Sequence, residues 1–152
     1  MKVEVNYDLN RKVEDQLFIE AKEENTLINN IIDLCDKGIE IVGYLNNCAH
    51  KINLNNIFYF KSIESKTYAI SNKDKYLIKG KSLESIYERI KEKRDFVQIS
   101  QSTIINLKYV KEFDLSFVGT IRCLLINGDF ELVSRRKVGI LKQKIKNMEE
   151  KI

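Results

Sequence analysis

The chain has 152 residues, of which 43% are apolar and 32% charged, and its 26 lysines and arginines exceed its 22 aspartates and glutamates to give a net charge of +4. This size and composition suit one folded domain with a small extension and exclude a disordered chain. No apolar run approaches the roughly 20 residues that a membrane span needs, and the first residues lack the apolar region of a signal peptide, so we expect a cytoplasmic protein without membrane insertion.

The charge is unevenly distributed along the chain. Residues 1–56 carry 6 Lys and Arg against 10 Asp and Glu, whereas residues 57–152 carry 20 against 12. Such asymmetry is expected when one part of a chain contacts a polyanion such as nucleic acid. Solvated lysines produce the same counts, so the charge pattern alone leaves both interpretations open.

The first 38 residues predict an acidic extension made of a strand and a helix. Val3–Tyr7 alternates apolar and polar residues as a strand does, and over 24–37 the apolar residues recur every three or four positions, as on one face of an amphipathic helix. Gly38 would end that helix. We therefore predict an extension at 1–38, serving as a dimerisation or partner surface, and a second domain at 39–152.

From Ile39 onward the sequence changes to short runs of Ile, Val, Tyr and Phe separated by turn residues, a pattern typical of β strands. The predicted strands are Glu40–Leu45, Ala49–Asn53, Ile57–Ser62, Thr67–Ser71 and Tyr76–Lys79. Ser82 is a suitable N-cap for a helix whose apolar residues follow at helical spacing as far as Ile90.

The rest of the chain predicts further strands and a final helix. Strands are expected at Phe96–Ile99 and Val110–Val118, followed by a hairpin in which Asn127-Gly128 forms a type I′ turn. Over 138–152 the apolar residues again step by three and four. The predicted fold class is mainly β (α+β), an antiparallel β assembly with two helices.

Catalytic and metal sites are not indicated by the residue types present. His50 is the only histidine, the three cysteines show no CxxC spacing, and no Gly-rich phosphate loop occurs. We expect reduced, buried thiols, no enzymatic activity and no cofactor.

Two polar stretches interrupt the β pattern in the basic part of the chain, Ser100–Thr103 (SQST) and Ser134–Lys137 (SRRK). The second places three cations next to a helix N-terminus, where the helix dipole disfavours them unless an anion such as phosphate is bound. Each stretch also has a simpler interpretation, the first as a turn whose hydroxyls satisfy backbone donors and the second as a solvated loop. Together they favour nucleic-acid binding, which needs phosphate clamps beside uncharged donors and acceptors.

The region from Ile57 to about Met148 resembles the LytTR DNA-binding domain of bacterial transcriptional regulators. The resemblance runs through NNIFYFKSIESKTYAI, YLIKGKSLESIYERI, FVQISQSTIINLKYVKEF and INGDFELVSRRKVGILKQKI, and its most specific part is the spacing of Ser102, Asn106, Tyr109-Val110, Asn127-Gly128 and Ser134-Arg135. It implies a compact, mostly antiparallel β fold without a helix-turn-helix, whose inter-strand loops enter successive major grooves of DNA.

By the same resemblance, three loops of this chain are expected to contact DNA. The implied contact residues are Lys66 and Thr67 in the first loop, Ser100, Gln101 and Ser102 in the second, and Arg135, Arg136 and Lys137 in the third. Asn106 and Ser134 are expected to brace the loops.

The sequence departs from the family at two places. Ser100 and Gln101 are neutral where His and a basic residue are common, and Ile99 stands where some members carry a redox-sensitive cysteine, so no redox switch is expected. Gln101 can still read a base, because a glutamine amide can pair with the N6 and N7 edge of adenine.

The residues before Ile57 are too few for a receiver domain, so the resemblance implies a stand-alone regulator. We expect sequence-specific binding to double-stranded DNA, by a homodimer on repeated operator half-sites. The alternative is a protein interaction module that binds an acidic partner through the same basic face.

Overall fold

The computed structural model describes residues 38–93 and 95–150. The elements described below belong to one compact unit, Ile39–Ile152. The strand and helix expected within residues 1–37 lie outside the described residues.

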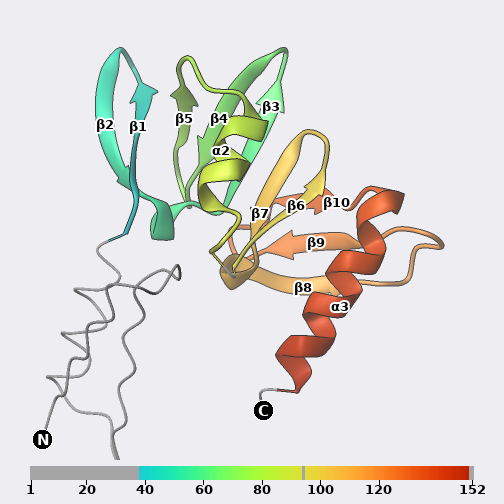
Figure 1. Ribbon diagram of the computed structural model, residues 1–152. Helices are drawn as coiled ribbons and strands as arrows, with labels where there is room; N and C mark the ends of the chain where they lie inside the picture. The colour runs from blue at the N-terminus through green and yellow to red at the C-terminus, as the bar shows by residue number, and fades with distance from the viewer. Residues whose placement is uncertain (1–37, 94, 151–152) are drawn as a thin grey trace, which may run out of the picture. The chain divides into compact units, whose positions relative to one another are not determined.

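Seven strands form an antiparallel sheet in the order β2-β1-β5-β4-β3-β7-β6 (Figure 1). Their bounds are β1 Glu40–Leu45, β2 Cys48–Asn53, β3 Tyr59–Ile63, β4 Lys66–Ile70, β5 Lys75–Ile78, β6 Phe96–Ser100 and β7 Thr103–Asn106. Two short 3₁₀ helices follow β2 and β7, namely η1 Leu54–Asn56 and η2 Leu107–Tyr109.

A smaller antiparallel sheet contains three strands in the order β10-β9-β8. The remaining bounds are β8 Val110–Asp114, β9 Arg122–Leu125, β10 Phe130–Leu132, α2 Leu83–Ile90, η3 Arg135–Lys137 and α3 Val138–Glu149. The predicted class, mainly β with two helices, is confirmed in the described part of the chain.

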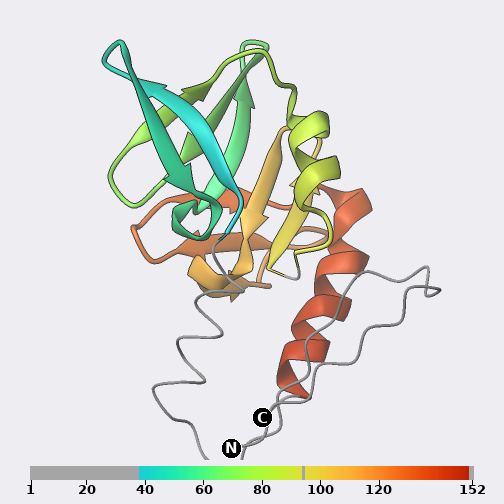
Figure 2. The same cartoon turned by 60° about the vertical axis from the view of Figure 1, so that its left-hand side comes forward.

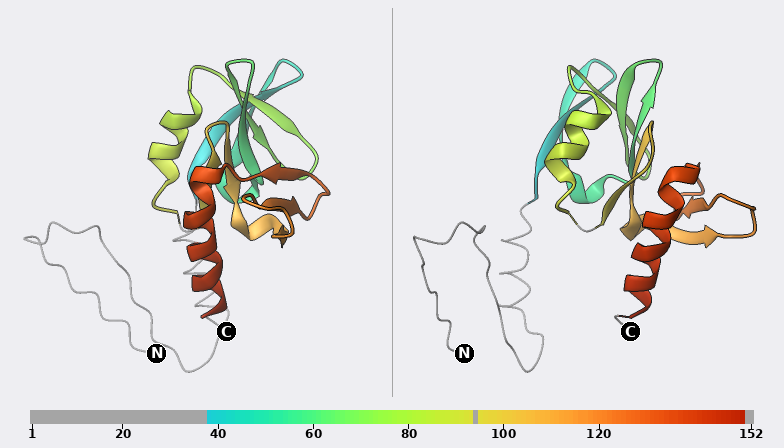
Figure 3. Two further views of the ribbon diagram at one scale, coloured as in Figure 1. Left: turned by 90° about the vertical axis from the view of Figure 1, so that its right-hand side faces the viewer. Right: turned by 45° about the vertical axis from the view of Figure 1, so that its right-hand side comes forward.

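The larger sheet has a hydrophobic core on each face. Because neighbouring residues of a strand point to opposite faces, Ile104 of β7 packs in the core that includes α2, whereas Ile105 packs in the core that includes the smaller sheet and α3. Figures 1 and 3 show α2 and α3 over different parts of the sheet. Burial on both faces explains the runs of consecutive apolar residues in β6 and β7.

The helix α2 begins where the sequence predicts. The Ser82 hydroxyl accepts a hydrogen bond from the backbone N–H of Ser85 at 3.1 Å, which caps the first turn. Leu83, Ile86 and Ile90 then form the buried face of the helix. This face fixes α2 against the larger sheet.

The predicted strand Val110–Val118 is too long, because β8 ends at Asp114. The Asp114 carboxylate accepts hydrogen bonds from the backbone N–H of Ser116 at 3.0 Å and from its hydroxyl at 2.6 Å. This local turn leads the chain away from the sheet, and Leu115 and Val118 are exposed.

The predicted type I′ turn at Asn127-Gly128 is also wrong. Gly128 has a left-handed φ of +91°, but Asn127 does not share it. The Gly128 N–H donates to the Leu125 carbonyl at 3.0 Å, and the Leu125 N–H donates to the Asp129 carbonyl at 2.8 Å. The connection is therefore a three-residue loop with glycine at the bulge position.

Consecutive left-handed residues, which a type I′ turn requires, occur elsewhere. They are Asn46-Asn47 (φ 50° and 63°) between β1 and β2, and Glu64-Ser65 (φ 47° and 62°) between β3 and β4.

The expectation of buried thiols holds for one of the two cysteines in the described residues. Cys123 is buried, whereas Cys48 is exposed. Cys48 begins β2, an edge strand whose side chains are mostly exposed. Figure 2 shows the β1–β2 hairpin, in cyan, at this edge.

Candidate nucleic-acid interface

Two backbone hydrogen bonds bring the three predicted contact segments together. The Ser62 N–H at the end of β3 donates to the Ser102 carbonyl at 2.9 Å, and the Ser134 N–H before η3 donates to the Ile99 carbonyl at 2.8 Å. The β6–β7 turn therefore lies between the β3–β4 hairpin and η3. These three segments, 62–66, 100–102 and 134–137, form the candidate surface.

The first segment is a tight turn with an exposed cation. Glu64 and Ser65 occupy the turn, and Lys66, which follows, is exposed. Thr67 does not join this surface, because it is 4% exposed and lies in the sheet between its β3 and β5 partners. Its side chain is therefore not available for the DNA contact that the family resemblance implied.

The second segment is a turn that is held by hydrogen bonds between its own residues and exposes an uncharged amide. The Ser100 hydroxyl accepts from the Ser102 N–H at 3.3 Å and lies 3.4 Å from the Ser102 hydroxyl. Gln101 is exposed at the tip. The hydroxyls thus hold the turn, as the simpler sequence interpretation suggested, while the Gln101 side chain is presented to the outside.

The third segment places cations at an uncapped helix start. Arg135 and Arg136 are exposed and Lys137 is partly buried. Neither η3 nor α3 has a side-chain cap, and the first turn of each contains no acidic residue. An anion bound here would complement the free N–H groups, the helix dipole and the arginines together.

The two residues expected to brace loops act at different places. Ser134 ties the third segment to the second through its backbone N–H. Asn106 lies at the far end of β7 from Ser102, where its Nδ2 donates to the Ile57 carbonyl at 2.9 Å and its Oδ1 accepts from the Lys108 N–H at 3.1 Å. Asn106 therefore braces the start of β3 and η2, not the second loop.

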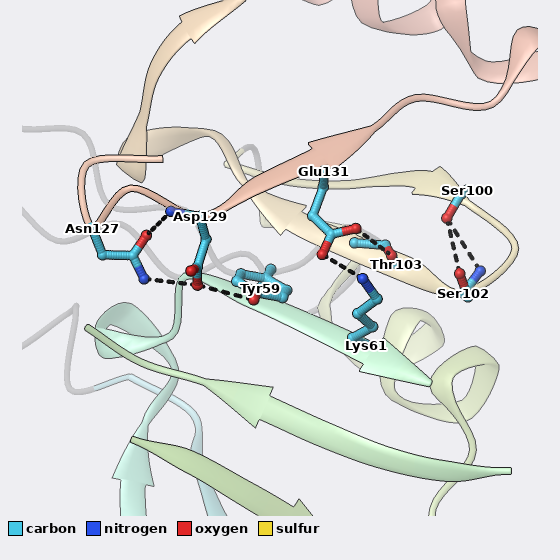
Figure 4. A network of polar contacts seen from close by, with 8 residues as sticks. All are labelled: Tyr59, Lys61, Ser100, Ser102, Thr103, Asn127, Asp129 and Glu131. Atoms are coloured by element: carbon cyan, nitrogen blue, oxygen red, sulfur yellow. Dashed lines mark hydrogen bonds and ion pairs between the residues drawn. The ribbon is translucent and has the colours of Figure 1, made fainter. Parts of the chain in front are cut away.

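A polar network links the two sheets directly beside this surface (Figure 4). The Lys61 ammonium lies 2.6 Å from Oε1 of Glu131, and the Thr103 hydroxyl donates to Oε2 of Glu131 at 3.5 Å. Lys61 and Thr103 are paired neighbours on β3 and β7. Glu131 of β10 therefore ties the smaller sheet to the two strands that lead into the first and second segments.

A second link joins Tyr59 and Asp129, which lie two residues before Lys61 and Glu131 in the sequence. The Tyr59 hydroxyl donates to Oδ2 of Asp129 at 3.0 Å, and the Asn127 amide donates to the same oxygen at 3.0 Å. Burial and this hydrogen bond raise the pKa of Tyr59 above its ordinary value, so the phenol stays protonated and keeps donating.

Sequence reasoning missed this network. The matched spacing of Tyr59 with Lys61 and of Asp129 with Glu131 was a usable signal, because residues two apart share one face of a strand. The partners are 70 positions apart in sequence, and only the packing of the two sheets reveals the pairing.

Among the described residues, no group of three or more His, Cys, Asp or Glu side chains is arranged to hold a metal ion. The candidate surface instead offers separated cations around a neutral amide, which suits contacts to an extended polyanion.

No helix in the described part of the chain is long and apolar enough to cross a membrane.

Comparison with known proteins identifies the family of this chain and several of its relatives. Residues 47–146 match the family described as the LytTr DNA-binding domain. An uncharacterized HTH-type transcriptional regulator of Staphylococcus aureus strain MSSA476 is 30% identical over 149 residues, which cover 94% of this chain and 98% of that protein. A protein with the same description from strain NCTC 8325 / PS 47 is 31% identical over 121 residues, 79% of each.

A solved structure shares the fold. The LytTr DNA-binding domain of a Bacillus cereus protein superposes with a TM-score of 0.64 at 18% identity, covering 70% of this chain and 95% of that one. In the part of the present chain that is described, β6 to β10 separate α2 from α3, so these two helices do not form a helix-turn-helix.

Proposed function

Because the chain belongs to the LytTr DNA-binding domain family, we propose that it is a transcriptional regulator that binds double-stranded DNA sequence-specifically through segments 62–66, 100–102 and 134–137. In this proposal the β3–β4 turn, the β6–β7 turn and η3 enter successive major grooves. Membership of a DNA-binding family agrees with the prediction that the chain is not an enzyme.

The observation that carries the proposal is the pair of backbone hydrogen bonds, Ser62 to Ser102 and Ser134 to Ile99. They hold three separately predicted segments side by side, with Lys66, Gln101, Arg135 and Arg136 exposed on them. A protein that reads DNA needs both groups that hold phosphates and groups that contact bases.

The residue types indicate which side chains contact phosphates and which contact bases. Lys66, Lys137 and one or both arginines hold phosphates, while Gln101, without a charge, is free to pair with an adenine edge in the major groove. The relatives from Staphylococcus aureus carry the name transcriptional regulator, which favours the same role for this chain.

We also propose how the regulator assembles and where it works. The chain acts as a homodimer on repeated half-sites, with residues 1–38 forming the dimerisation or partner surface. As a regulator of the bacterial chromosome it works in the cytoplasm. Sedimentation of the full chain at micromolar concentration should give the dimer mass, and a folded monomer there would contradict this part alone.

A protein interaction module that binds an acidic partner through the same cations is the competing function. Both functions weaken with salt, so salt dependence does not separate them. Competition does: a regulator keeps its selected DNA in the presence of excess random DNA, whereas a generic polyanion surface loses both equally.

The experiment starts with selection of bound duplexes from a random pool, followed by fluorescence anisotropy on the selected sequence. With Arg136 as a base contact, replacement Arg136→Ala should weaken binding by about 1 to 3 kcal/mol. The matched control is Lys51→Ala, an exposed cation on the edge strand β2. Equal losses in the two variants would remove Arg136 from the contact surface.

A further inference from the structure

A pocket of about 300 Å³ lies between β1, the end of β5 and α2. It uses none of the residues of the candidate DNA surface. In the larger sheet β1 and β5 are separated from β3, β7 and β6 by β4, so the pocket belongs to a different part of the fold.

The floor of the pocket is apolar. Ile78, Ile86 and Ile90 line it with exposed fractions of 5%, 4% and 1%, and Ile41 of β1 packs against the same core. Val42 is 49% exposed, although it is fully apolar. A ligand with an apolar body would remove this surface from water, and the volume is at the lower end of ordinary small-molecule sites.

Among the described residues that line the pocket, three are cations, Lys79, Lys81 and Arg89, and one is a carboxylate, Glu40. All three are exposed, and none forms an ion pair with any residue that the structure describes. The Lys79 ammonium lies 3.9 Å from the ring centre of Tyr44, which also lines the pocket. Lys79 thus has an aromatic partner, and none of the three cations has an anionic partner among the described residues.

We propose that this pocket binds a small, soluble, amphipathic carboxylate, with its apolar body against the apolar lining of the pocket and its carboxylate among the three cations. A bare phosphate would gain nothing from the isoleucine floor, and a neutral apolar molecule would gain nothing from the cations. The combination of both features fits an amphipathic anion, and the class proposed here is an apolar monoacid.

Ligand binding in this pocket is separate from DNA binding, and it can be measured in the absence of DNA. The probe is decanoate, titrated below its micelle concentration into the uniformly ¹⁵N-labelled full chain, with 1-decanol as the uncharged match and decyltrimethylammonium as the match of opposite charge. Decanoate should shift the amide signals of β1, of 78–81 and of α2, and should bind at least about tenfold more tightly than either match, because a charged hydrogen bond is lost with each.

Variants locate the charge contact. Arg89→Gln and Lys81→Gln should each weaken decanoate binding several-fold while leaving the weak decanol affinity unchanged. Lys73→Gln, an exposed cation outside the pocket lining, should change neither. Since all three positions are exposed, the variants should keep the amide spectrum of the folded chain.

Three results would each overturn the proposal. They are equal affinities for decanoate, decanol and the cation; decanoate shifts centred outside β1, 78–81 and α2; and equal weakening by Lys73→Gln and Arg89→Gln. Loss of DNA binding in any variant would bear on the proposed regulator, and it would not alter the outcome of this titration.

Discussion

Asp129 and Glu131 join the smaller sheet to the larger one through Tyr59 and Lys61 of β3. The Glu131 side chain is 11% exposed and that of Lys61 35% exposed, so the pair is only partly screened by water. Removing one partner of such a pair leaves the other charge poorly solvated. We therefore expect Glu131 to matter for stability.

Replacement Glu131→Gln should lower the free energy of unfolding by about 1 to 3 kcal/mol, because the Lys61 ammonium loses its carboxylate. Urea denaturation measures the change. Glu112→Gln is the matched control, since Glu112 is exposed on β8, and it should stay within about 0.5 kcal/mol of the parent chain. Equal destabilisation by the two variants would show that the Lys61 pair contributes nothing specific.

The direction in which Glu131→Gln changes the affinity for DNA tests whether Glu131 positions the DNA-binding segments. Loss of a negative charge by itself strengthens binding to a polyanion. Because Glu131 fixes β10 against the strands that lead into segments 62–66 and 100–102, the proposed regulator should instead bind its selected DNA more weakly while its affinity for random DNA does not fall. A parallel gain on both DNAs would contradict this positioning role.

The buried thiol of Cys123 is expected to be chemically inert in the folded chain. Burial, and next the charge of Glu131, raise its pKa from 9.0 to about 12, so at pH 8 only about one thiol in 10,000 is ionised. Iodoacetamide at pH 8 followed by peptide mapping should label the exposed Cys48 and leave Cys123 unmodified until urea is added. Rapid labelling of Cys123 without urea would mean that the core around it opens readily.

The shift also fixes a direction for stability against pH. The folded pKa of Cys123 lies above the unfolded value, so its contribution to stability is fully present below pH 9.0 and is lost as pH rises toward about 12.

At the level of elements, the β3–β4 turn is conformationally costly. Glu64 and Ser65 both have left-handed φ angles, of 47° and 62°, which glycine and asparagine adopt far more readily. The β1–β2 turn has the same geometry but is made of Asn46 and Asn47. The turn beside Lys66 therefore keeps a less suitable sequence in the segment proposed to contact DNA.

Replacement of Glu64-Ser65 by Asn-Gly should raise the free energy of unfolding by about 1 to 2 kcal/mol, since it relieves two left-handed residues. Thermal and urea denaturation measure the gain. Asn47→Gly in the other hairpin is the control and should give a smaller gain, because asparagine already tolerates this conformation. No gain from the Asn-Gly turn would mean that tertiary contacts, and not the turn residues, set its geometry.

Local patterns were enough to predict most elements but not how they meet. Ser82 gave the start of α2, and the runs of β-branched and aromatic residues gave strands close to those observed. Turn type at Asn127-Gly128 depended on the register of β9 with β10, which the dipeptide does not determine. The orientation of Thr67 depended on both faces of the sheet being covered, which no single strand pattern reveals.

For the candidate site, too, local sequence patterns predicted the segments but not all of their contacts. The segments around Gln101 and Arg136 could be named from the sequence because their polarity interrupts the β pattern and matches a family spacing. The role of Asn106 was misassigned because the sequence does not show which backbone groups its side chain contacts. The hydrogen bonds to Ile57 and Lys108 show that it supports the start of β3 and η2.

At the scale of the whole described unit, the two proposed sites occupy separate regions. The proposed DNA surface is built on β3, β6, β7 and η3, whereas the proposed carboxylate pocket is built on β1, β5 and α2. α2 packs against β3 and β7 as well as lining the pocket. The helix therefore contacts both regions, although no residue is shared between them.

A titration of the ¹⁵N-labelled full chain with a selected DNA duplex, followed through its amide signals, tests directly which segments contact DNA. The amide signals of Lys66, Gln101, Arg135 and Arg136 should shift most, and those of the β1–β2 hairpin and the outer face of α2 should shift little. Largest shifts on β1, β2 or α2, with segments 62–66, 100–102 and 134–137 unchanged, would contradict the proposed DNA surface.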